Sequence, residues 1–513
     1  MSRCRGWDRE ARVSRHTMSS SPAGAAVVPV TEDAAREAEE HKQRANQHIK
    51  EKKFALAVEN YDLAIGVNPN NHVYYGNRAL AHIRLENYGS AIVDADKCIE
   101  LNPGYVKAYY RRADANLALN KIKLALLDFR RASKYAPKDP DLRRKLQQCE
   151  KAVKVMQFEK ALATPQEEVV PAYSKVVLED MVVEEGFTGS RMAKDAEGKD
   201  VVTLDFVLSM IEDFKAGRKL HRRYAYSIIL GALEIFKELP NVVRVDVPKG
   251  SKFTVCGDVH GQFFDLLNIF ELNGMVSEEN PYLFNGDFVD RGSWSAEVIF
   301  TLFALKCLYP RSLHLARGNH ESKNMNKIYG FEGEIQAKYT QQMADVFREV
   351  FCWLPLGHII NEKAFVVHGG LFASDDVTIP DLQSFDRNRE PPDEGYMCEM
   401  LWSDPQEPLG RAPSKRGVAI QFGPDVTKAF LERNNLDLVI RSHEVKDEGY
   451  TVEHDGFLVT VFSAPNYCDH MGNKGAFITF SGEDFKMNFT KFSAVEHPDI
   501  KPMAYANNYL FGG

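Results

Sequence analysis

Three prolines recur at a fixed interval in the first third of the chain, because Pro69, Pro103 and Pro137 are each separated by 34 residues. Alanines keep the same interval at two further positions, in the sets Ala45, Ala79, Ala113 and Ala57, Ala91, Ala125. Small residues at matched positions allow paired helices to pack closely, and a constant interval makes each unit pack against the next in the same way. The sequence therefore predicts a helical solenoid at the front of the chain.

A period of 34 residues is that of tetratricopeptide repeats. Ala57 with Tyr61, and Ala125 with Phe129, also reproduce the small-to-aromatic step of that repeat. We place three repeats at about 38–71, 72–105 and 106–139, with an amphipathic helix over about 139–161 covering the last one. The alternative is an unrelated helical bundle with accidental periodicity, which agreement at several positions disfavours.

The expected concave groove of this solenoid carries cations and amides at first-helix positions. These are Lys42, Asn46, Asn77, Arg84, Lys107 and Arg111. The set resembles the carboxylate clamp of chaperone-binding tetratricopeptide domains, which hold the acidic C-terminal tail of the ninety-kilodalton heat-shock chaperone. Long cations and amides bind carboxylates through charge-assisted hydrogen bonds. A solvated basic helix face is the alternative.

Further along the chain, short apolar runs are each followed directly by a polar cluster. The runs cover 253–256, 282–284, 313–316, 364–367, 436–440 and 458–462. Buried strands have this composition, and in layered α/β folds functional residues gather where strands end. We therefore expect an α/β domain whose chemistry lies at the strand ends.

The polar clusters supply three imidazoles, two carboxylates and one carboxamide. These belong to Asp258, His260, Asp287, Asn319, His368 and His443. A nitrogen and oxygen set without thiolate suits Mn, Fe or Zn, with Mg as a further candidate. Two metals that share a carboxylate suit phosphoester hydrolysis, because the attacking and departing oxygens both need positive charge beside them. Scattered structural polar residues are the alternative, which so many strand ends of one kind disfavour.

The clusters read GDVHG at 257–261, GDFVDRG at 286–292 and GNHE at 318–321. In this order they closely resemble the signatures of the phosphoprotein phosphatase family of serine/threonine phosphatases, over about 202–495. The resemblance implies a metallophosphoesterase domain with a central β-sandwich flanked by helices. It also implies hydrolysis of phosphoserine and phosphothreonine in protein substrates.

The resemblance assigns a ligand set to each of two divalent metal ions. One set is Asp258, His260 and Asp287, and the other is Asp287, Asn319, His368 and His443, so that Asp287 bridges the two metals. A hydroxide held between the metals is expected to attack phosphorus in line, because bound cations depress the pKa of water.

The family also implies roles for residues around the metals. His320 corresponds to the general acid that protonates the departing alkoxide, and Asp290 to the carboxylate that holds its imidazole. The family's phosphate contacts correspond to Arg291, Asn319, Arg416 and Tyr467. Surface ion pairs are the alternative for the two arginines.

Relatives with repeats in front of the phosphatase domain are held inactive when the repeats fold over the catalytic cleft. Chaperone tails or fatty acids release them. Glu86 matches the family position that contacts the cleft arginine, so we hypothesise an ion pair with Arg291 as the latch. A carboxylate there would imitate the charge of substrate phosphate and favour the closed state.

The whole chain then divides into five parts: a disordered tail over 1–30, repeats with a capping helix over 38–163, a linker over 164–200, a catalytic domain over 201–495 and a C-terminal regulatory tail over 496–513. A transit peptide is the alternative for the first part. The net charge of −8 argues against nucleic acid or anionic membrane as the main partner. Scattered cysteines favour a reducing compartment, and no apolar run approaches the roughly 20 residues of a membrane span. The family suggests residence in the cytoplasm and nucleus.

Two other functions remain open at this stage. In the first, the repeats act as a co-chaperone scaffold and the phosphatase domain is inert, although intact Asp287 and His320 speak against this. In the second, the site is that of a dimetal phosphodiesterase or nucleotide hydrolase, against which the family resemblance of the two arginines counts.

Overall fold

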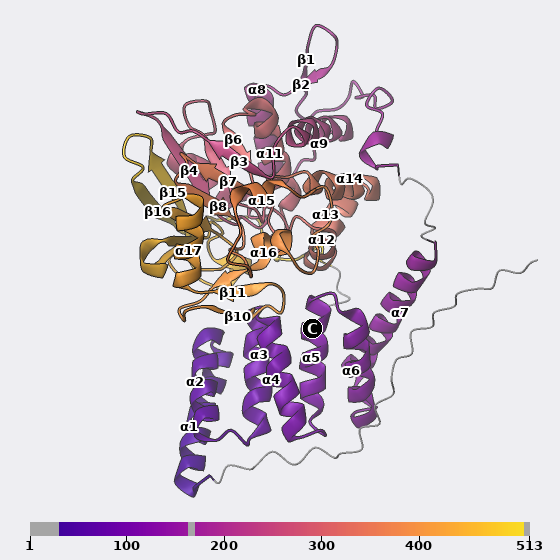
Figure 1. Cartoon of the computed structure of the whole chain (residues 1–513). Helices are drawn as coiled ribbons and strands as arrows, with labels where there is room; N and C mark the ends of the chain where they lie inside the picture. Colours follow the sequence, from indigo (N-terminus) through magenta and orange to yellow (C-terminus); the bar gives the residue numbers. More distant parts are fainter. Residues whose placement is uncertain (1–29, 163–169, 507–513) are drawn as a thin grey trace, which may run out of the picture.

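The computed structural model describes residues 30–162 and 170–506, which form a stack of helices followed by an α/β domain (Figure 1). The stack consists of α1 (Glu32–Lys50), α2 (Phe54–Val67), α3 (His72–Arg84), α4 (Tyr88–Leu101), α5 (Val106–Ala118), α6 (Ile122–Tyr135) and α7 (Pro140–Leu162). The predicted helical solenoid is confirmed. The expected disordered tail lies outside the described residues.

The 34-residue period has a physical basis in the packing of this stack. The six periodic alanines are all fully buried, where helices of one pair touch. Two arginines repeat the same ion pairs one unit apart: Arg78 binds Asp94, and Arg112 binds Asp128, in both cases with Nη2 at 2.6 Å from a carboxylate oxygen. Identical contacts at identical offsets therefore join the two helices of each of these repeats, and the same two arginines bind Asp62 and Asp96 of the preceding repeats.

Two β-sheets form the centre of the second domain. The six-stranded sheet has the order β13-β14-β12-β8-β7-β3, and the five-stranded sheet has the order β16-β15-β4-β5-β6. Their bounds are β3 Val242–Val245, β4 Lys252–Cys256, β5 Tyr282–Phe284, β6 Leu313–Leu315, β7 Gly357–Ile360, β8 Ala364–Val367, β12 Leu438–Arg441, β13 Tyr450–Glu453, β14 Leu458–Val461, β15 Gly475–Ser481 and β16 Met487–Phe492. Apolar residues of both sheets, such as Val255 and Ile440, share one core. The predicted β-sandwich is confirmed.

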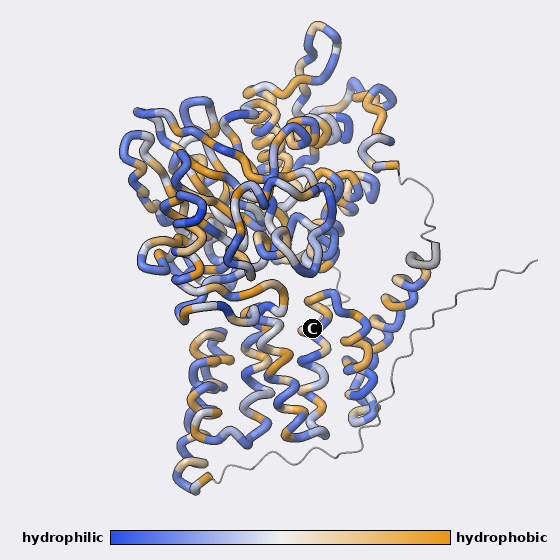
Figure 2. Tube along the Cα trace, viewed as in Figure 1, coloured by the Kyte–Doolittle hydropathy of each residue, from blue (hydrophilic) through white to orange (hydrophobic). Residues whose placement is uncertain are grey.

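Helices cover both outer faces of the sandwich. On the five-stranded sheet lie α8 (Leu204–Lys215), α9 (Arg222–Lys237), α10 (Phe263–Asn273), α11 (Ser295–Leu308), α13 (Phe331–Lys338) and α14 (Gln341–Cys352). The short helix α12 (Lys323–Tyr329) packs instead against Trp402 and Met503. The other sheet packs against α15 (Ile379–Gln383), α16 (Tyr396–Trp402) and α17 (Pro424–Asn434). Figure 2 shows apolar stretches along the strands of this domain, whereas polar and apolar residues alternate along the solenoid helices.

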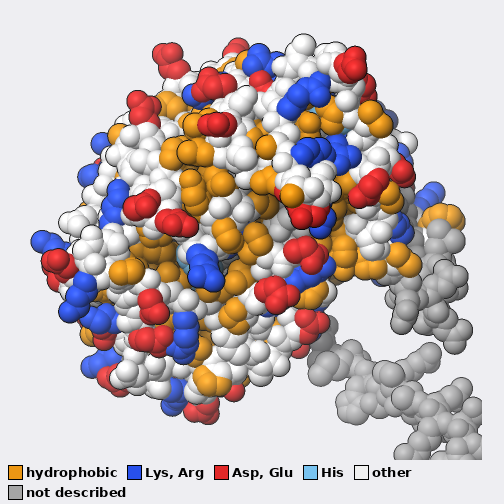
Figure 3. All heavy atoms as spheres, turned by 90° about the horizontal axis from the view of Figure 1, so that it is seen from above, with side chains coloured by type: hydrophobic (Ala, Val, Ile, Leu, Met, Phe, Trp, Pro, Cys, Tyr) orange, Lys and Arg blue, Asp and Glu red, His pale blue; other side chains and the backbone are white. Residues whose placement is uncertain are grey.

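A small sheet of order β10-β11-β9 lies where the α/β domain meets the solenoid (Figure 1). It consists of β9 (Asp404–Pro405), β10 (Arg411–Pro413) and β11 (Ile420–Phe422). On the face seen from above, Lys and Arg side chains are interspersed with Asp and Glu rather than gathered into one basic patch (Figure 3). Within the described part of the chain, no helix combines the length and the apolar character that crossing a membrane requires.

Residues 170–200, expected to belong to a linker, carry short elements that pack on the α/β domain. These are η1 (Tyr173–Lys175), β1 (Ala193–Lys194) and β2 (Asp200–Val201). The carboxylate of Glu349 in α14 accepts hydrogen bonds from the N–H groups of Ala172 (2.8 Å) and Tyr173 (3.0 Å). This segment is therefore anchored to the α/β domain, while residues 163–169 lie outside the described structure.

Candidate active site

The predicted ligand residues come from strand ends of both sheets. In one sheet β4, β5 and β6 run parallel, and Asp258, His260, Asp287 and Asn319 follow them. In the other sheet β8 and β12 run parallel, and His368 and His443 follow them. All six side chains are buried. The sandwich therefore brings the carboxyl ends of five strands to one place.

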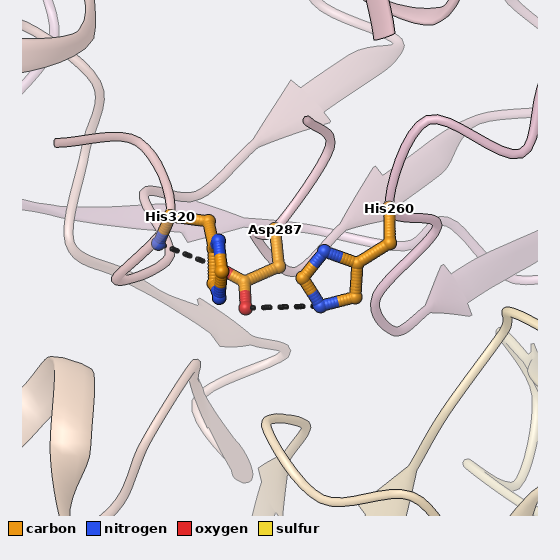
Figure 4. A group of neighbouring side chains, drawn as sticks. All are labelled: His260, Asp287 and His320. Atoms are coloured by element: carbon orange, nitrogen blue, oxygen red, sulfur yellow. Dashed lines mark hydrogen bonds and ion pairs between the residues drawn. The ribbon is translucent and has the colours of Figure 1, made fainter. Parts of the chain in front are cut away.

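The ligand atoms converge on Asp287. Its Oδ2 lies 3.5 Å from Nε2 of His260 and 3.3 Å from Nε2 of His368. The same nitrogen of His368 lies 2.8 Å from Oδ1 of Asn319 and 3.2 Å from Nδ1 of His443. Within the described residues, two groups could each hold a metal ion, and Asp287 belongs to both. The first is His260–Asp287–His320, which Figure 4 shows, and the second is Asp287–His368–His443. A shared carboxylate is what a two-metal site requires.

The hydrogen bonds of the imidazoles test whether this set suits cations. Nδ1 of His260 donates to the carbonyl of Val289 at 3.0 Å, and Nδ1 of His368 donates to the carbonyl of Asn285 at 2.8 Å. Because a carbonyl only accepts, each Nδ1 carries the proton and each Nε2 presents a lone pair to the cluster. Lone pairs and carboxylate oxygens thus face one another, an arrangement that a cation stabilises.

The electrostatics of the carboxylates agree with this interpretation. Burial raises the pKa of Asp258 to about 7, and burial also raises the pKa of Asp287 well above its usual value. Burial lowers the pKa of His443 well below its usual range, so this imidazole is neutral. Such carboxylates need adjacent positive charge to ionise fully at neutral pH. The residues present therefore fit divalent metal ions.

His320 lies beside this cluster and is held by Asp290. Its Nδ1 donates to Oδ2 of Asp290 at 2.8 Å, and its backbone N–H donates to Oδ1 of Asp287 at 2.9 Å (Figure 4). Asp290 is fully buried and also accepts from Asn326 Nδ2 at 3.1 Å and from the N–H of Phe331 at 2.9 Å. The carboxylate is thus fixed by α12 and α13, and it fixes the imidazole in turn.

Several residues of the site adopt the left-handed backbone conformation, with positive φ angles. Positive φ angles occur at His260 (43°), Asp287 (51°), Asp290 (70°), Arg291 (69°) and His443 (70°). Non-glycine residues adopt such angles at a cost that the surrounding structure must offset, and they cluster at functional sites. Steric crowding requires glycine at the first position of the GNHE motif, because a Cβ on Gly318 would lie 2.2 Å from Oδ1 of Asp287.

Glu321 ties two of the strand-end loops together. Its carboxylate accepts hydrogen bonds from the N–H groups of Asp287, Phe288 and Gly318, each at 2.8 Å. The last residue of the GNHE motif therefore holds the loop after β5 against the loop after β6, and it makes the positions of Asp287 and Asn319 interdependent.

Different residues hold the two arginines that are predicted to bind phosphate. Nε of Arg416 lies 2.6 Å from Asp404, and its Nη2 donates to the carbonyl of His443 at 2.8 Å. The guanidinium of Arg291 stacks 3.8 Å above the ring of Tyr329. Both arginines are buried or nearly so, unlike the surface ion pairs that were the alternative.

Sequence reasoning missed two of these supports. Asp404, in β9, binds Arg416 and also binds Nη2 of the fully buried Arg441 at 2.8 Å. Tyr329, at the end of α12, is the platform for Arg291. Neither residue lies in a motif. The only sequence signal was Arg441 itself, two residues before the predicted ligand His443.

Tyr467 also lies at the site, with its ring centroid 5.1 Å from that of His260. Cys468 follows it, and burial raises the pKa of this thiol to about 12. A thiol so hard to ionise is a poor nucleophile, so we assign no catalytic role to Cys468.

The solenoid reaches the site through the turn between α3 and α4. Glu86 Oε2 lies 2.5 Å from Nη2 of Arg291, and the hydroxyl groups of Tyr88 and Tyr329 are 3.2 Å apart. The N–H of Ser90 donates to the carbonyl of Lys415, next to Arg416, at 3.0 Å. The ion pair of the latch hypothesis is therefore present in this structure.

Three of the six predicted clamp residues contact one another across three helices. Asn77 Nδ2 donates to Oδ1 of Asn46 at 3.4 Å, and Arg111 Nη1 donates to Oδ1 of Asn77 at 3.3 Å. Of the other three, Lys42 on α1 pairs with Glu39 at 2.5 Å, Arg84 ends α3 and Lys107 lies in the first turn of α5. All six lie on the first helices of their repeats.

Comparisons with known proteins agree with this architecture. Residues 251–447 match the calcineurin-like phosphoesterase family, residues 146–244 the PPP5 TPR repeat region, and residues 72–105 and 106–139 the tetratricopeptide repeat. The chain is 56% identical to serine/threonine-protein phosphatase 5 of Arabidopsis thaliana, over 92% of this chain and 97% of that protein. It is 53% identical to serine/threonine-protein phosphatase 5 of Homo sapiens, over 94% of this chain and 95% of that protein.

A solved structure gives the same result for the α/β domain. A serine/threonine phosphatase from Saccharomyces cerevisiae, described as similar to human phosphatase PP5, matches with a TM-score of 0.57 and 46% identity. The match covers 59% of this chain and 100% of that one.

Proposed function

The chain belongs to the serine/threonine-protein phosphatase 5 family and is a serine/threonine-protein phosphatase, and we propose that the site around Asp287 carries out the hydrolysis of phosphoserine and phosphothreonine in proteins. The observation that carries the proposal is the position of Asp287 in two groups of converging ligand atoms, beside an imidazole held by a carboxylate. Asp258, His260 and Asp287 would hold one divalent ion, and Asp287, Asn319, His368 and His443 the other. Mn, Fe or Zn suit this set, with Mg as a further candidate.

When bound, the two ions supply positive charge beside phosphorus and an activated water as nucleophile. The protein's own residues supply the rest. Asn319, Arg291, Arg416 and Tyr467 surround the place of the phosphoryl oxygens. Asp404 fixes the guanidinium plane of Arg416 at 2.6 Å, so that no reorganisation is needed when charge shifts in the transition state.

His320 serves as the general acid for the departing alkoxide. Asp290 Oδ2 accepts a hydrogen bond from Nδ1–H of His320, with the two atoms 2.8 Å apart, which leaves Nε2 to deliver a proton to the leaving oxygen. Because Asp290 is buried and held by Asn326 and the backbone of Phe331, it also stabilises the imidazolium form.

The arrangement of the two domains supports autoinhibition by the solenoid. Oε2 of Glu86 forms an ion pair with Nη2 of Arg291 at 2.5 Å, so a substrate phosphate must displace this carboxylate to reach the arginine. The Tyr88–Tyr329 contact and the bond from Ser90 to Lys415 hold the same turn over the site. The closed form therefore competes directly with substrate.

Activation by an acidic chaperone tail acts through the same repeat. Asn77 and Arg84 lie on α3, and Glu86 follows α3 by two residues. A terminal carboxylate bound by Lys42, Asn46, Asn77, Lys107 and Arg111 would pull on the helix whose end carries the latch. Residence in the cytoplasm and nucleus, where such chaperones and phosphoproteins occur, belongs to the same proposal.

The test is hydrolysis of a phosphoserine peptide by the full chain after metal removal and after reloading with Mn²⁺, beside His320→Ala. We expect no turnover without metal, recovery with Mn²⁺, and a loss of roughly 10²- to 10⁴-fold in kcat for His320→Ala. Retained metal binding in the variant, measured by elemental analysis, is the control. Equal turnover in the variant and the parent would contradict the assignment of His320.

A further inference from the structure

Asn285 lies where the two sheets meet at the site, and the proposed mechanism gives its side chain no role. It directly follows β5, in the five-stranded sheet, and it precedes Asp287 by two residues. Its backbone N–H donates to the carbonyl of Cys256, the last residue of β4, at 2.9 Å. The residue is fully buried, so the positions of its polar atoms depend on the protein groups around them.

The carboxamide of Asn285 reaches across to the six-stranded sheet. Its Nδ2 donates one hydrogen bond to the carbonyl of Val367, the last residue of β8, at 2.9 Å, and another to Oγ of Ser442, directly after β12, at 3.0 Å. The two acceptors immediately precede His368 and His443 in the chain. One side chain thus holds the ends of both strands that carry these imidazoles.

The main chain of Asn285 adds a third contact to the same group. Its carbonyl accepts from Nδ1 of His368 at 2.8 Å, and the N–H of Ser442 donates to the carbonyl of His368 at 3.0 Å. Because Nδ1 of His368 is bonded in this way, its Nε2 faces Oδ2 of Asp287 at 3.3 Å. Outer hydrogen bonds of this kind orient metal-binding imidazoles. The contacts of Asn285 therefore gather on the ligand set that includes His368 and His443.

The oxygen of the carboxamide gains nothing from its burial. Oδ1 of Asn285 accepts no hydrogen bond from any group in the described part of the chain. The opposite orientation of the amide is disfavoured, because it would turn Oδ1 towards the carbonyl oxygen of Val367, which can only accept. A buried acceptor without a donor lowers stability, so an apolar side chain of similar shape would suit the fold equally well. The amide therefore contributes to the geometry of the site rather than to the stability of the fold.

We propose that Asn285 is a positioning residue for the metal ion that His368 and His443 would hold, because it fixes the two imidazoles through the ends of β8 and β12. The proposal rests on the phosphatase function described above. The ligands Asp258 and His260 of the other ion follow β4, whose contact with Asn285 is through the main chain. Loss of the carboxamide should therefore weaken one metal site and leave the other unchanged.

The experiment titrates the metal-free full chain with Mn²⁺ by calorimetry and compares the parent with Asn285→Leu, whose side chain has the same branching without polar atoms. In the variant we expect one dissociation constant unchanged and the other raised by roughly 10- to 100-fold, the usual effect of losing an outer hydrogen bond of a metal ligand. His443→Ala identifies the weakened site, because it should abolish binding with the same constant. The midpoint of urea unfolding of metal-free Asn285→Leu should be at least that of the parent.

Ser442→Ala tests the same hydrogen bond from its other end, and it replaces Asn285→Leu if that variant does not fold. It should raise the same dissociation constant, and the double variant should raise it no further than Asn285→Leu alone, because the bond to the serine is then already absent. The matched control is Asn434→Leu. This partly buried carboxamide of α17 donates to the carbonyls of Val377 and Phe430, and its loss should leave both constants unchanged.

Two outcomes would overturn the proposal. The first is that both dissociation constants stay unchanged in Asn285→Leu and in Ser442→Ala. The second is an equal rise of both constants together with a fall in the unfolding midpoint, which would make Asn285 important for the fold alone. Failure of the phosphatase function itself has a different signature, because the parent would then bind no Mn²⁺ or would hydrolyse no phosphoserine peptide.

Discussion

The carboxylate of Asp404 shows how much of the site depends on a residue outside every motif. It is buried between Arg416 and Arg441, at 2.6 Å and 2.8 Å. Although burial opposes ionisation, these two arginines hold the pKa of Asp404 below its usual value. The carboxylate therefore stays charged and keeps both guanidinium groups in place.

Replacing Asp404 by Asn should leave the two arginines without their counter-charge. We expect a loss of ~3 kcal/mol in stability and a fall of roughly 10- to 100-fold in kcat/KM, because Arg416 no longer presents a fixed plane to phosphate. Urea unfolding and peptide hydrolysis check the two effects separately. Asp425→Asn, an exposed carboxylate on α17, is the control, and parent-like kinetics in Asp404→Asn would contradict the role given to this residue.

His314 on β6 predicts a pH dependence of stability that is separate from catalysis. Its ring packs against Phe253 and His358, and burial lowers the pKa of His314 to about 3. Between this value and the unfolded pKa of about 6.5, only the unfolded chain binds the proton. Stability contributed by neutral His314 is thus present above pH 6.5 and is lost as the pH falls.

The free energy of unfolding should therefore drop on going from pH 7 to pH 5, by up to ~1.4 kcal/mol per pH unit from this residue alone. In His314→Gln that part of the slope disappears, which urea unfolding at several pH values would show. An identical slope in His314→Gln and the parent would refute the assignment.

At the scale of elements, α4 and the loop around Arg416 touch through their main-chain atoms. A Cβ on Gly89 would lie 2.5 Å from the nitrogen of Gly417 and 2.8 Å from the carbonyl of Ser414. Real Cβ atoms do not approach so closely, so any side chain at position 89 forces the two domains apart. Glycine is thus required here by the closed form and not by the helix.

Gly89→Ala should raise basal activity several-fold while leaving the solenoid intact, since alanine favours helix by about 1 kcal/mol over glycine. Peptide hydrolysis and helix content by circular dichroism measure the two properties. Gly66→Ala is the matched control, because a Cβ on Gly66 of α2 meets nothing within 4 Å. Unaltered basal activity in Gly89→Ala would show that this contact does not hold the closed form.

The sequence predicted the strands and helices better than it predicted the contacts that support the site. The runs predicted at 282–284 and 364–367 coincide with β5 and β8, and the ligand residues follow their strands as expected. The supports of the site were not predictable. Tyr329 and Asp404 reach the arginines through folding of distant segments, and such contacts leave no period or spacing in the chain.

At the scale of the whole molecule, the repeats and the phosphatase domain meet at Arg291, the arginine that we propose binds the substrate phosphate. Glu86, in the solenoid, and Arg291, in the cleft, are far apart in the chain and 2.5 Å apart in space. Tyr88 and Ser90 strengthen the same contact. The structure thus represents a form in which the solenoid covers the proposed phosphate site.

The most direct test of this account compares phosphopeptide hydrolysis by the full chain and by Glu86→Gln, each with and without a peptide that imitates an acidic chaperone tail. We predict basal activity raised by roughly tenfold in Glu86→Gln, and stimulation by the peptide that is large in the parent, small in Glu86→Gln and lost in Lys107→Glu. Basal activity in Glu86→Gln equal to that of the parent, with stimulation undiminished, would contradict it.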